Sequence, residues 1–181
     1  MKKRLTLLQM DVHVNDVEYN YNRVQELLTQ SLTENPDIIV LPETWNTGFH
    51  PSDDLITIAD RNGERTKSLL TAFAKEHNVN IVGGSVAVAK DDLVFNTSYA
   101  YNREGDLVGE YSKMHGFSPA KEDKYFASGT HTTHFKLDGI PCSTVICYDI
   151  RFPELVRMAA LPGTELLFVP AQWPTMRLRH W

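Results

Sequence analysis

A cysteine at the end of an apolar run is the candidate nucleophile of this sequence. Residues 143–146 predict a β-strand that carries Cys147 at its carboxyl end, and Pro153 suits the first turn of a following helix, where a missing N–H is tolerated. The free N–H groups and the positive end of that helix are expected to lower the pKa of the thiol and could face a developing oxyanion. Buried cysteines are more often inert members of a core, so a catalytic Cys147 needs partners elsewhere in the chain.

Two candidate partners also follow predicted strands. Glu43 comes after the apolar run at residues 38–41, and Lys113 comes after the run at residues 107–112. Ligands gather at the carboxyl edge of the sheet in α/β proteins, so these side chains could meet the thiol there. Taken singly, a glutamate or a lysine in a loop is usually only a solvated charge.

Apolar runs bounded by turn residues predict the strands that must position these groups. The strands are expected at residues 5–10, 37–41, 79–89, 93–101, 107–112, 133–137, 143–146 and 165–169. Gly83 and Gly84 indicate a bulge or a close backbone approach within the third of them. Asp138 and Gly139 predict a tight hairpin turn before the cysteine strand.

Helices are expected between several of these strands. The first opens at a capping box formed by Asn15 and Glu18, the second begins near Gly63, and the third covers residues 152–161. The β-α-β-α-β order, followed by hairpins, predicts an α/β layered domain with a mixed sheet.

The composition is that of an ordinary globular protein. Its 181 residues, 42% of them hydrophobic and 23% charged, predict one domain spanning residues 1–181. A net charge of -5 without a Lys/Arg cluster argues against nucleic acid or an anionic membrane as partner and favours a small molecule or a protein. No apolar run is long enough for a membrane span or a signal peptide, so a reducing cytoplasm is expected. There Cys142 and Cys147, which point to opposite faces of one predicted strand, should stay unpaired.

Three motifs in this sequence resemble the nitrilase, or carbon-nitrogen hydrolase, superfamily. They are L-P-E-T-W-N-T-G-F around Glu43, Y-S-K-M-H-G-F around Lys113 and V-I-C-Y-D-I-R-F-P-E around Cys147, in the order that the family uses. The closing P-A-Q-W-P and R-L-R-H-W are similar to the ω-amidase branch, which acts on α-keto acid amides. The resemblance implies a nitrilase-like four-layer αββα sandwich with mixed sheets, no metal or organic cofactor, and a homodimer.

The resemblance also implies a role for each residue of the site. Glu43 is the general base that takes the proton of Cys147, and Cys147 attacks the amide carbonyl. Lys113 and the backbone N–H of Tyr148 stabilise the oxyanion. Glu122, nine residues after Lys113, matches the second glutamate of the family, although its neighbour Asp123 leaves an alternative open.

The chemistry of these residue types agrees with that reading. An amide is a poor acyl donor, and a covalent thioester divides its hydrolysis into two easier steps. One donor aimed at the oxyanion supplies roughly 3 to 4 kcal/mol. We therefore expect an ω-amidase-like hydrolase of a small amide, with a nitrilase or an N-carbamoyl amine hydrolase as near rivals and an inactive binding module as the rival from another class.

Histidines offer two competing chemistries. His115 could serve as a base for Cys147 in the manner of a cysteine protease, if it reaches the thiol. His131 and His134 with Cys142 could ligate zinc, but their spacing matches no structural zinc pattern.

Aromatic and basic residues are candidates for the substrate pocket. Trp45, Phe117 and Trp173 could form its walls, with an ordinary core position as the alternative. Arg151 could pair with a substrate carboxylate or, equally, with Glu154 or Asp149.

The resemblance carries one departure. Chains of this family continue beyond the R-x-x-H-W point through another helix and further strands. The sandwich is therefore expected to be incomplete at its C-terminal end, with apolar faces and strand edges uncovered.

Overall fold

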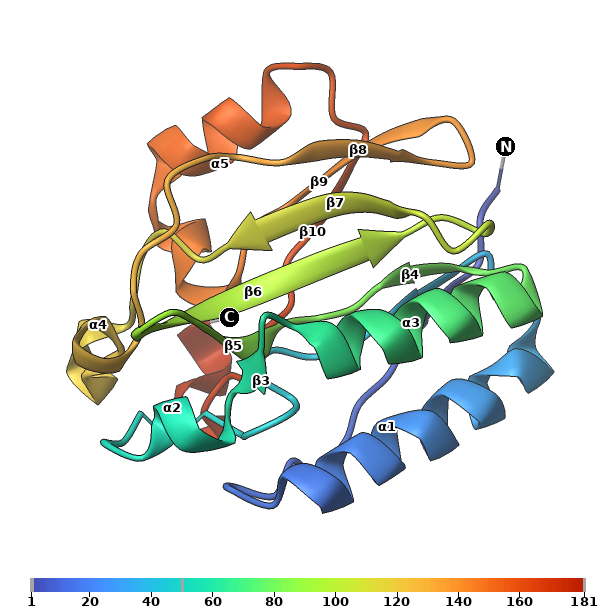
Figure 1. Ribbon diagram of the computed structural model, residues 1–181. Coiled ribbons are helices and arrows are strands. Elements are labelled where there is room, and N and C mark those ends of the chain that lie inside the picture. Colours follow the sequence, from blue (N-terminus) through green and yellow to red (C-terminus); the bar gives the residue numbers. More distant parts are fainter. Residues whose placement is uncertain (1, 50, 181) are drawn as a thin grey trace.

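Two sheets packed face to face lie between two outer layers of helices in the computed structural model, which describes residues 2–49 and 51–180 (Figure 1). Helices α1 (Val17–Ser31) and α3 (Glu64–His77) cover one face of a seven-stranded sheet. A three-stranded sheet packs on the other face, and α5 (Pro153–Ala160) covers the outer side of that sheet. This arrangement confirms the expected αββα sandwich.

The seven-stranded sheet contains both parallel and antiparallel pairs. Its strands, in spatial order, are β1 (Leu5–Leu7), β2 (Ile38–Val40), β4 (Asn80–Val82), β6 (Leu93–Tyr101), β5 (Val86–Lys90) and β3 (Asp60–Arg61), with β7 (Leu107–Ser112) also on β6. Strand β2 runs parallel to β4, and β6 runs antiparallel to both β4 and β7. Because two reversals restore the direction, β2 and β7 end at the same edge of the sheet.

The smaller sheet is built on the predicted hairpin. Strands β8 (His134–Leu137) and β9 (Ile140–Thr144) are antiparallel, and β10 (Leu166–Phe168) runs parallel to β9. Asp138 and Gly139 both have positive φ angles, 50° and 80°, as a two-residue hairpin turn requires. The hairpin prediction is therefore confirmed.

Strand β2 shows how sequence pattern produces the layers. Ile38 and Val40 pack between the two sheets, whereas Ile39 and Leu41 pack under α1 and α3. Side chains alternate along a strand, so a strand that is covered on both faces must be continuously apolar. Helix α5 packs Leu155 and Ala159 against the smaller sheet in the same way.

The run at residues 79–89 is two strands rather than the single strand expected. Gly84 has a φ of 61°, and a Cβ atom on it would lie 1.9 Å from the carbonyl oxygen of Pro42. The close backbone approach is therefore confirmed, but residues 83–85 leave the strand and divide the run into β4 and β5. It also presses this segment against the loop that follows β2.

The cap of α1 and several short elements also differ from the sequence predictions. The prediction of a capping box at Asn15 and Glu18 is wrong, because Asp16 caps α1 and its side chain accepts the N–H of Tyr19. Short elements carried no periodic signal: α2 (Leu55–Ile58), α4 (Glu122–Tyr125) and the 3-10 helices η1 (Leu32–Glu34), η2 (Ser118–Ala120), η3 (Cys147–Arg151) and η4 (Thr175–His180). Trp181 of the closing motif lies outside the described residues. Across residues 2–49 and 51–180, no helix combines the length and apolar character needed to cross a membrane.

Candidate active site

The loop after β2 is fixed by Ser85. The N–H of Ser85 donates to the carbonyl of Pro42 (3.0 Å), its carbonyl accepts from the N–H of Trp45 (3.1 Å), and its hydroxyl accepts from the N–H of Thr44 (3.0 Å). These bonds need the close approach that Gly84 permits. They hold Glu43 completely buried at the carboxyl edge of the sheet.

Lys113 lies between two buried carboxylates. Its Nζ is 2.8 Å from Oε1 of Glu43, and 2.9 and 2.8 Å from the two oxygens of Glu122. The side chains of Lys113 and Glu43 are 3% and 0% exposed. Burial alone would lower the pKa of Lys113, but the charges of Glu43 and Glu122 outweigh burial and raise it. The lysine is therefore an ammonium at neutral pH.

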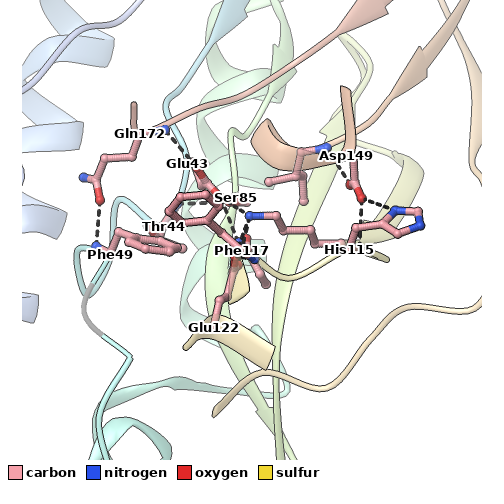
Figure 2. Close-up of polar contacts among 12 residues, drawn as sticks. Glu43, Thr44, Phe49, Ser85, His115, Phe117, Glu122, Asp149 and Gln172 are labelled. Carbon is pink, nitrogen blue, oxygen red and sulfur yellow. Dashed lines mark hydrogen bonds and ion pairs between the residues drawn. The ribbon is translucent and has the colours of Figure 1, made fainter. Parts of the chain in front are cut away.

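Neutral N–H groups also donate hydrogen bonds to both carboxylates. The side-chain amide of Asn96 donates to Oε1 of Glu43 (3.0 Å) and to Oε1 of Glu122 (3.1 Å). The N–H of Gln172 donates to Glu43 (2.8 Å), and the N–H of Phe117 donates to Glu122 (2.7 Å). Figure 2 shows the carboxylates of Glu43 and Glu122 converging from different segments. The cluster holds two carboxylates and one ammonium, so one negative charge is not balanced within it.

Cys147 begins the 3-10 helix η3 with a φ of 46°, a backbone conformation that residues other than glycine rarely adopt. Its N–H donates to the carbonyl of Pro170 (2.9 Å), and the residue is 7% exposed. Burial raises the pKa of the thiol, the charge of Glu43 and a hydrogen bond to Glu43 raise it further, and Lys113 offsets part of this. The expectation of a lowered thiol pKa is therefore wrong for this resting state. The thiol keeps its proton at neutral pH and needs a base, and the carboxylate of Glu43 is close enough for its charge to raise the pKa of the thiol.

Asp149 anchors the turn that carries Cys147. Its buried carboxylate accepts the N–H of Ile146 (3.0 Å), the hydroxyl of Tyr111 (2.7 Å) and the N–H of His115 (3.0 Å). Tyr111 belongs to β7, which also leads to Lys113, so Asp149 ties the lysine segment to the cysteine turn. Figure 2 shows Asp149 and His115 beside this cluster.

His115 is held by the same carboxylate. Its Nδ1 lies 3.0 Å from Oδ1 of Asp149, and its ring stacks on Phe152 at 3.6 Å. This geometry gives His115 a place in the support of the cysteine turn, because both its N–H and its ring nitrogen contact Asp149.

Two of the aromatic candidates, Trp173 and Phe117, lie at the cysteine turn together with Tyr148. Trp173 packs in the same apolar cluster as Cys147, and the rings of Phe117 and Tyr148 meet edge to face at 5.1 Å. The guanidinium carbon of Arg151 lies 5.4 Å from the centre of the Trp173 ring. The N–H of Tyr148, at the second position of η3, has no acceptor within that helix and is available for an oxyanion.

Trp45 is elsewhere. It is completely buried in the core under α1 and α3, meets Tyr21 edge to face at 4.8 Å, and donates its Nε1–H to the carbonyl of Gly83 (2.9 Å). The expectation that Trp45 lines a substrate pocket is therefore wrong, because the tight loop after β2 turns this ring away from the sheet edge and into the core.

The structure also bears on two alternatives, Asp123 in place of Glu122 and a zinc site at His131, His134 and Cys142. Glu122 is buried in the cluster, whereas Asp123 is exposed, so Glu122 is the second carboxylate that meets Lys113. Over the described ranges, no group of three His, Cys, Asp or Glu side chains could hold a metal ion.

Sequence reasoning missed Asn96 and Gln172 and gave Asp149 only a minor part. An asparagine in the apolar run of β6 was the available signal for the first, because a polar side chain on a covered strand needs a partner. No capping pattern marks Asp149, because Ile146, three positions before it, has no side-chain acceptor and contributes only its N–H. Gln172 acts mainly through its backbone, which no sequence pattern reports.

Comparisons with known proteins give a consistent picture. Residues 4–181 match the family described as carbon-nitrogen hydrolase. The chain is 40% identical over 181 residues to a Bacillus subtilis (strain 168) protein named 2-oxoglutaramate amidase, a match that covers 100% of this chain and 69% of that protein. It is 28% identical to a chloroplastic omega-amidase of Arabidopsis thaliana, covering 99% of this chain and 52% of that one.

A solved structure shares the fold. The protein XC1258 from Xanthomonas campestris, described as a CN-hydrolase superfamily protein with an arsenic adduct in its active site, superposes with a TM-score of 0.87 at 28% identity. The match covers 99% of this chain and 68% of that one. The chain thus spans about two thirds of the length of the Bacillus and Xanthomonas relatives.

Proposed function

The chain belongs to the carbon-nitrogen hydrolase family, and we propose that it is a thiol-dependent amidase that releases ammonia from a small α-keto acid amide such as 2-oxoglutaramate. One observation carries the proposal. The charges of Glu43 and Lys113 both act on the pKa of the Cys147 thiol, and the carboxylate of Glu43 lies 2.8 Å from the ammonium of Lys113. A nucleophile, a base and a cation therefore meet at one place.

The first half-reaction forms a thioester. Glu43 accepts the thiol proton while Sγ of Cys147 bonds to the amide carbon, and the carbonyl electron pair moves onto oxygen. Nζ of Lys113 and the N–H of Tyr148 stabilise that oxyanion. When the tetrahedral intermediate collapses, the C–N bond breaks and Glu43 gives its proton to the departing nitrogen, which leaves as ammonia.

The second half-reaction returns the enzyme to its starting state. Glu43 takes a proton from a water molecule whose oxygen attacks the thioester carbon, and the same donors stabilise the second oxyanion. Collapse then breaks the C–S bond, and the sulfur recovers its proton from Glu43. Because burial raises the pKa of the thiol, reprotonation of the sulfur is favourable.

The substrate's own carboxylate needs a cation near the cysteine turn. Arg151 follows Cys147 within η3, and its guanidinium stacks over Trp173, which packs beside Cys147. We assign Arg151 to the carboxylate of the keto acid, and Phe117, Tyr148 and Trp173 to the walls that contact the carbon chain. Simple aliphatic amides without a carboxylate would then be poorer substrates.

Ammonia release tests the proposal. Wild type is expected to release ammonia from 2-oxoglutaramate faster than from a nitrile of similar length, and faster than it hydrolyses an N-carbamoyl amine. Cys147→Ala should abolish release, whereas Cys142→Ala, the matched change at the other free cysteine, should retain it because Cys142 packs between the sheets.

Each rival predicts a different result. Preferred turnover of the nitrile or the carbamoyl compound would replace the amidase assignment with that activity. No turnover of any of the three, with no covalent adduct on Cys147, would favour an inactive binding module.

We also propose that residues 1–181 form one domain, that the protein works in the cytoplasm, and that it forms a homodimer. A reducing compartment keeps Cys147 reduced. Met158 of α5 and Leu161, which follows the helix, are exposed (53% and 69%) and form an apolar surface suited to a second copy. Light scattering of the purified protein should give twice the monomer mass, and a monomer mass would contradict the dimer.

A further inference from the structure

Asn96 lies between the two carboxylates of the candidate site. It is 1% exposed on β6, and its Nδ2 is 3.0 Å from Glu43 and 3.1 Å from Glu122. Its backbone carbonyl also accepts the N–H of Lys113 (2.9 Å). One residue therefore contacts all three charged members of the cluster.

The orientation of the Asn96 amide follows from its neighbours. Ionised carboxylates only accept hydrogen bonds, so the NH2 group must face Glu43 and Glu122 and the carbonyl oxygen must face away. That oxygen, Oδ1, has no hydrogen-bond partner among the described residues. The amide is thus oriented entirely by the two carboxylates, and not by a structural network of its own.

The cavity beside the Asn96 side chain is too small for an amide substrate. The cavity that Asn96 lines with Lys113, Glu122 and Phe126 has a volume of about 10 Å³, which is room for about one water molecule. An effect of Asn96 on catalysis must therefore pass through the groups that it holds.

We propose that Asn96 is a positioning residue that fixes the spacing of Glu43 and Glu122 around Lys113. This inference rests on the proposed function. The two carboxylates repel one another, and a single ammonium attracts both, so Glu43 could follow Lys113 away from the thiol. The two N–H groups of Asn96 hold one oxygen of each carboxylate on a rigid strand, which keeps Glu43 aligned with Cys147.

The test substitutes the side chain and keeps the backbone bond to Lys113. Asn96→Ala is expected to lower kcat about 100-fold and to change KM less than about 3-fold, because displacing a reacting group by an ångström is enough for such a loss. Asn96→Ser, which keeps one donor, should fall between Asn96→Ala and wild type. It also remains informative if Asn96→Ala does not fold.

Thr97→Val is the matched control. Thr97 is the next residue on β6, is equally buried, and bonds Ser112 through its hydroxyl, but its side chain points to the opposite face. Thr97→Val should lower stability without a comparable loss of kcat. Equal kcat losses in Asn96→Ala and Thr97→Val would overturn the proposal.

A second readout does not depend on amide turnover. Alkylation of Cys147 by iodoacetamide, followed by intact mass, should slow at least about 10-fold in Asn96→Ala and should stay within about 2-fold of wild type in Thr97→Val. The effects of Asn96→Ala and Glu122→Gln should be non-additive, because both act on the same cluster. Unchanged alkylation in Asn96→Ala, or effects that multiply fully with Glu122→Gln, would overturn the positioning role. Slower alkylation in a protein that hydrolyses no amide would support this role while rejecting the proposed function.

Discussion

Two clusters of ion pairs, each with a cation between two carboxylates, lie at opposite ends of strands β2 and β9. Strand β2 is preceded by Asp37 and followed by Glu43, and β9 is preceded by Asp138 and followed by Cys147. At the first end, Arg103 bridges Asp37 (2.9 Å) and Asp138 (2.8 Å). At the second end, Lys113 bridges Glu43 and Glu122 at the same distances, 2.8 Å each.

The two clusters differ in solvent exposure and in charge balance. The carboxylates of the Arg103 cluster keep 18% to 32% of their exposure, and Lys3 adds a second cation at 2.6 Å from Asp138, so charges balance. The carboxylates around Lys113 are completely buried and outnumber their cation. Similar distances therefore do not imply similar roles. The partly exposed, balanced cluster ties loops together, and the buried, unbalanced cluster is the one to which we assign the proposed catalytic base.

The largest expected effect is the loss of the buried cation. Lys113→Met leaves Glu43 and Glu122 facing one another without compensation, and removing one partner of a buried pair costs about 3 to 5 kcal/mol. Urea unfolding measures the loss. Lys90→Met is the matched control, because Lys90 lies 2.8 Å from Glu110 but both side chains are about a third exposed, so its loss should stay below about 1 kcal/mol. Equal losses in the two variants would remove the distinction between buried and exposed clusters.

The anchor of the cysteine turn should have the next largest effect. Asp149→Asn replaces an acceptor that serves four donor groups with an amide that presents two hydrogens to them, so the turn should shift relative to Lys113. We expect kcat to fall about 10- to 100-fold, with a stability loss of about 2 kcal/mol. Steady-state kinetics combined with thermal unfolding measure both. A stability loss with unchanged kcat would make Asp149 a purely structural residue.

A substitution at the opposite end should affect stability alone. Arg103→Ala removes the bridge between Asp37 and Asp138, which should cost about 1 kcal/mol because both carboxylates keep access to water. Amide turnover by the folded protein should remain within about 2-fold of wild type. A 10-fold loss of kcat would show that the two ends of the sandwich are coupled.

The smallest expected effect is on acid stability. A hydrogen bond from Arg103, together with Lys3, lowers the pKa of Asp138 well below its ordinary value. A carboxyl group with a lowered pKa in the folded state stabilises the protein above its unfolded pKa of about 3.9, and this stabilisation is lost as the pH falls below that value. Asp138→Asn should therefore flatten the decline in stability between about pH 4 and pH 2 by a fraction of a kcal/mol. Identical pH profiles for Asp138→Asn and wild type would contradict this.

The sequence predicted the ends of strands better than the contacts made there. Glu43, Lys113 and Cys147 were placed together because each follows an apolar run, and β2 and β7 do end at the same edge of the seven-stranded sheet. Strand β9 belongs to the smaller sheet and ends at Thr144, so the strand predicted at residues 143–146 was placed too late in the chain. The apolar runs predicted an α/β layered domain with a mixed sheet, and the four-layer αββα arrangement followed only from the resemblance to the family. The catalytic roles of these residues remain predictions.

Features that depend on distant contacts were not predictable. Asn96 contacts the carboxylates across 53 and 26 residues of chain, and no local pattern reports such a contact. The pKa of Cys147 was predicted in the wrong direction, because burial and the charge of Glu43 outweigh the N–H groups of a short 3-10 helix. The orientation of Trp45 depended on a backbone approach that only Gly84 allows.

The most direct test of the account is the acylation of Cys147 in the presence and absence of its base. Wild type mixed with 2-oxoglutaramate and quenched rapidly should gain the mass of one acyl group on Cys147, with loss of ammonia. Glu43→Gln keeps the size of the side chain but cannot take the thiol proton, so its acylation should slow at least about 1000-fold. Acylation of Glu43→Gln at the wild-type rate, or an adduct on Cys142 instead, would contradict the assignment of Glu43 as the base for Cys147.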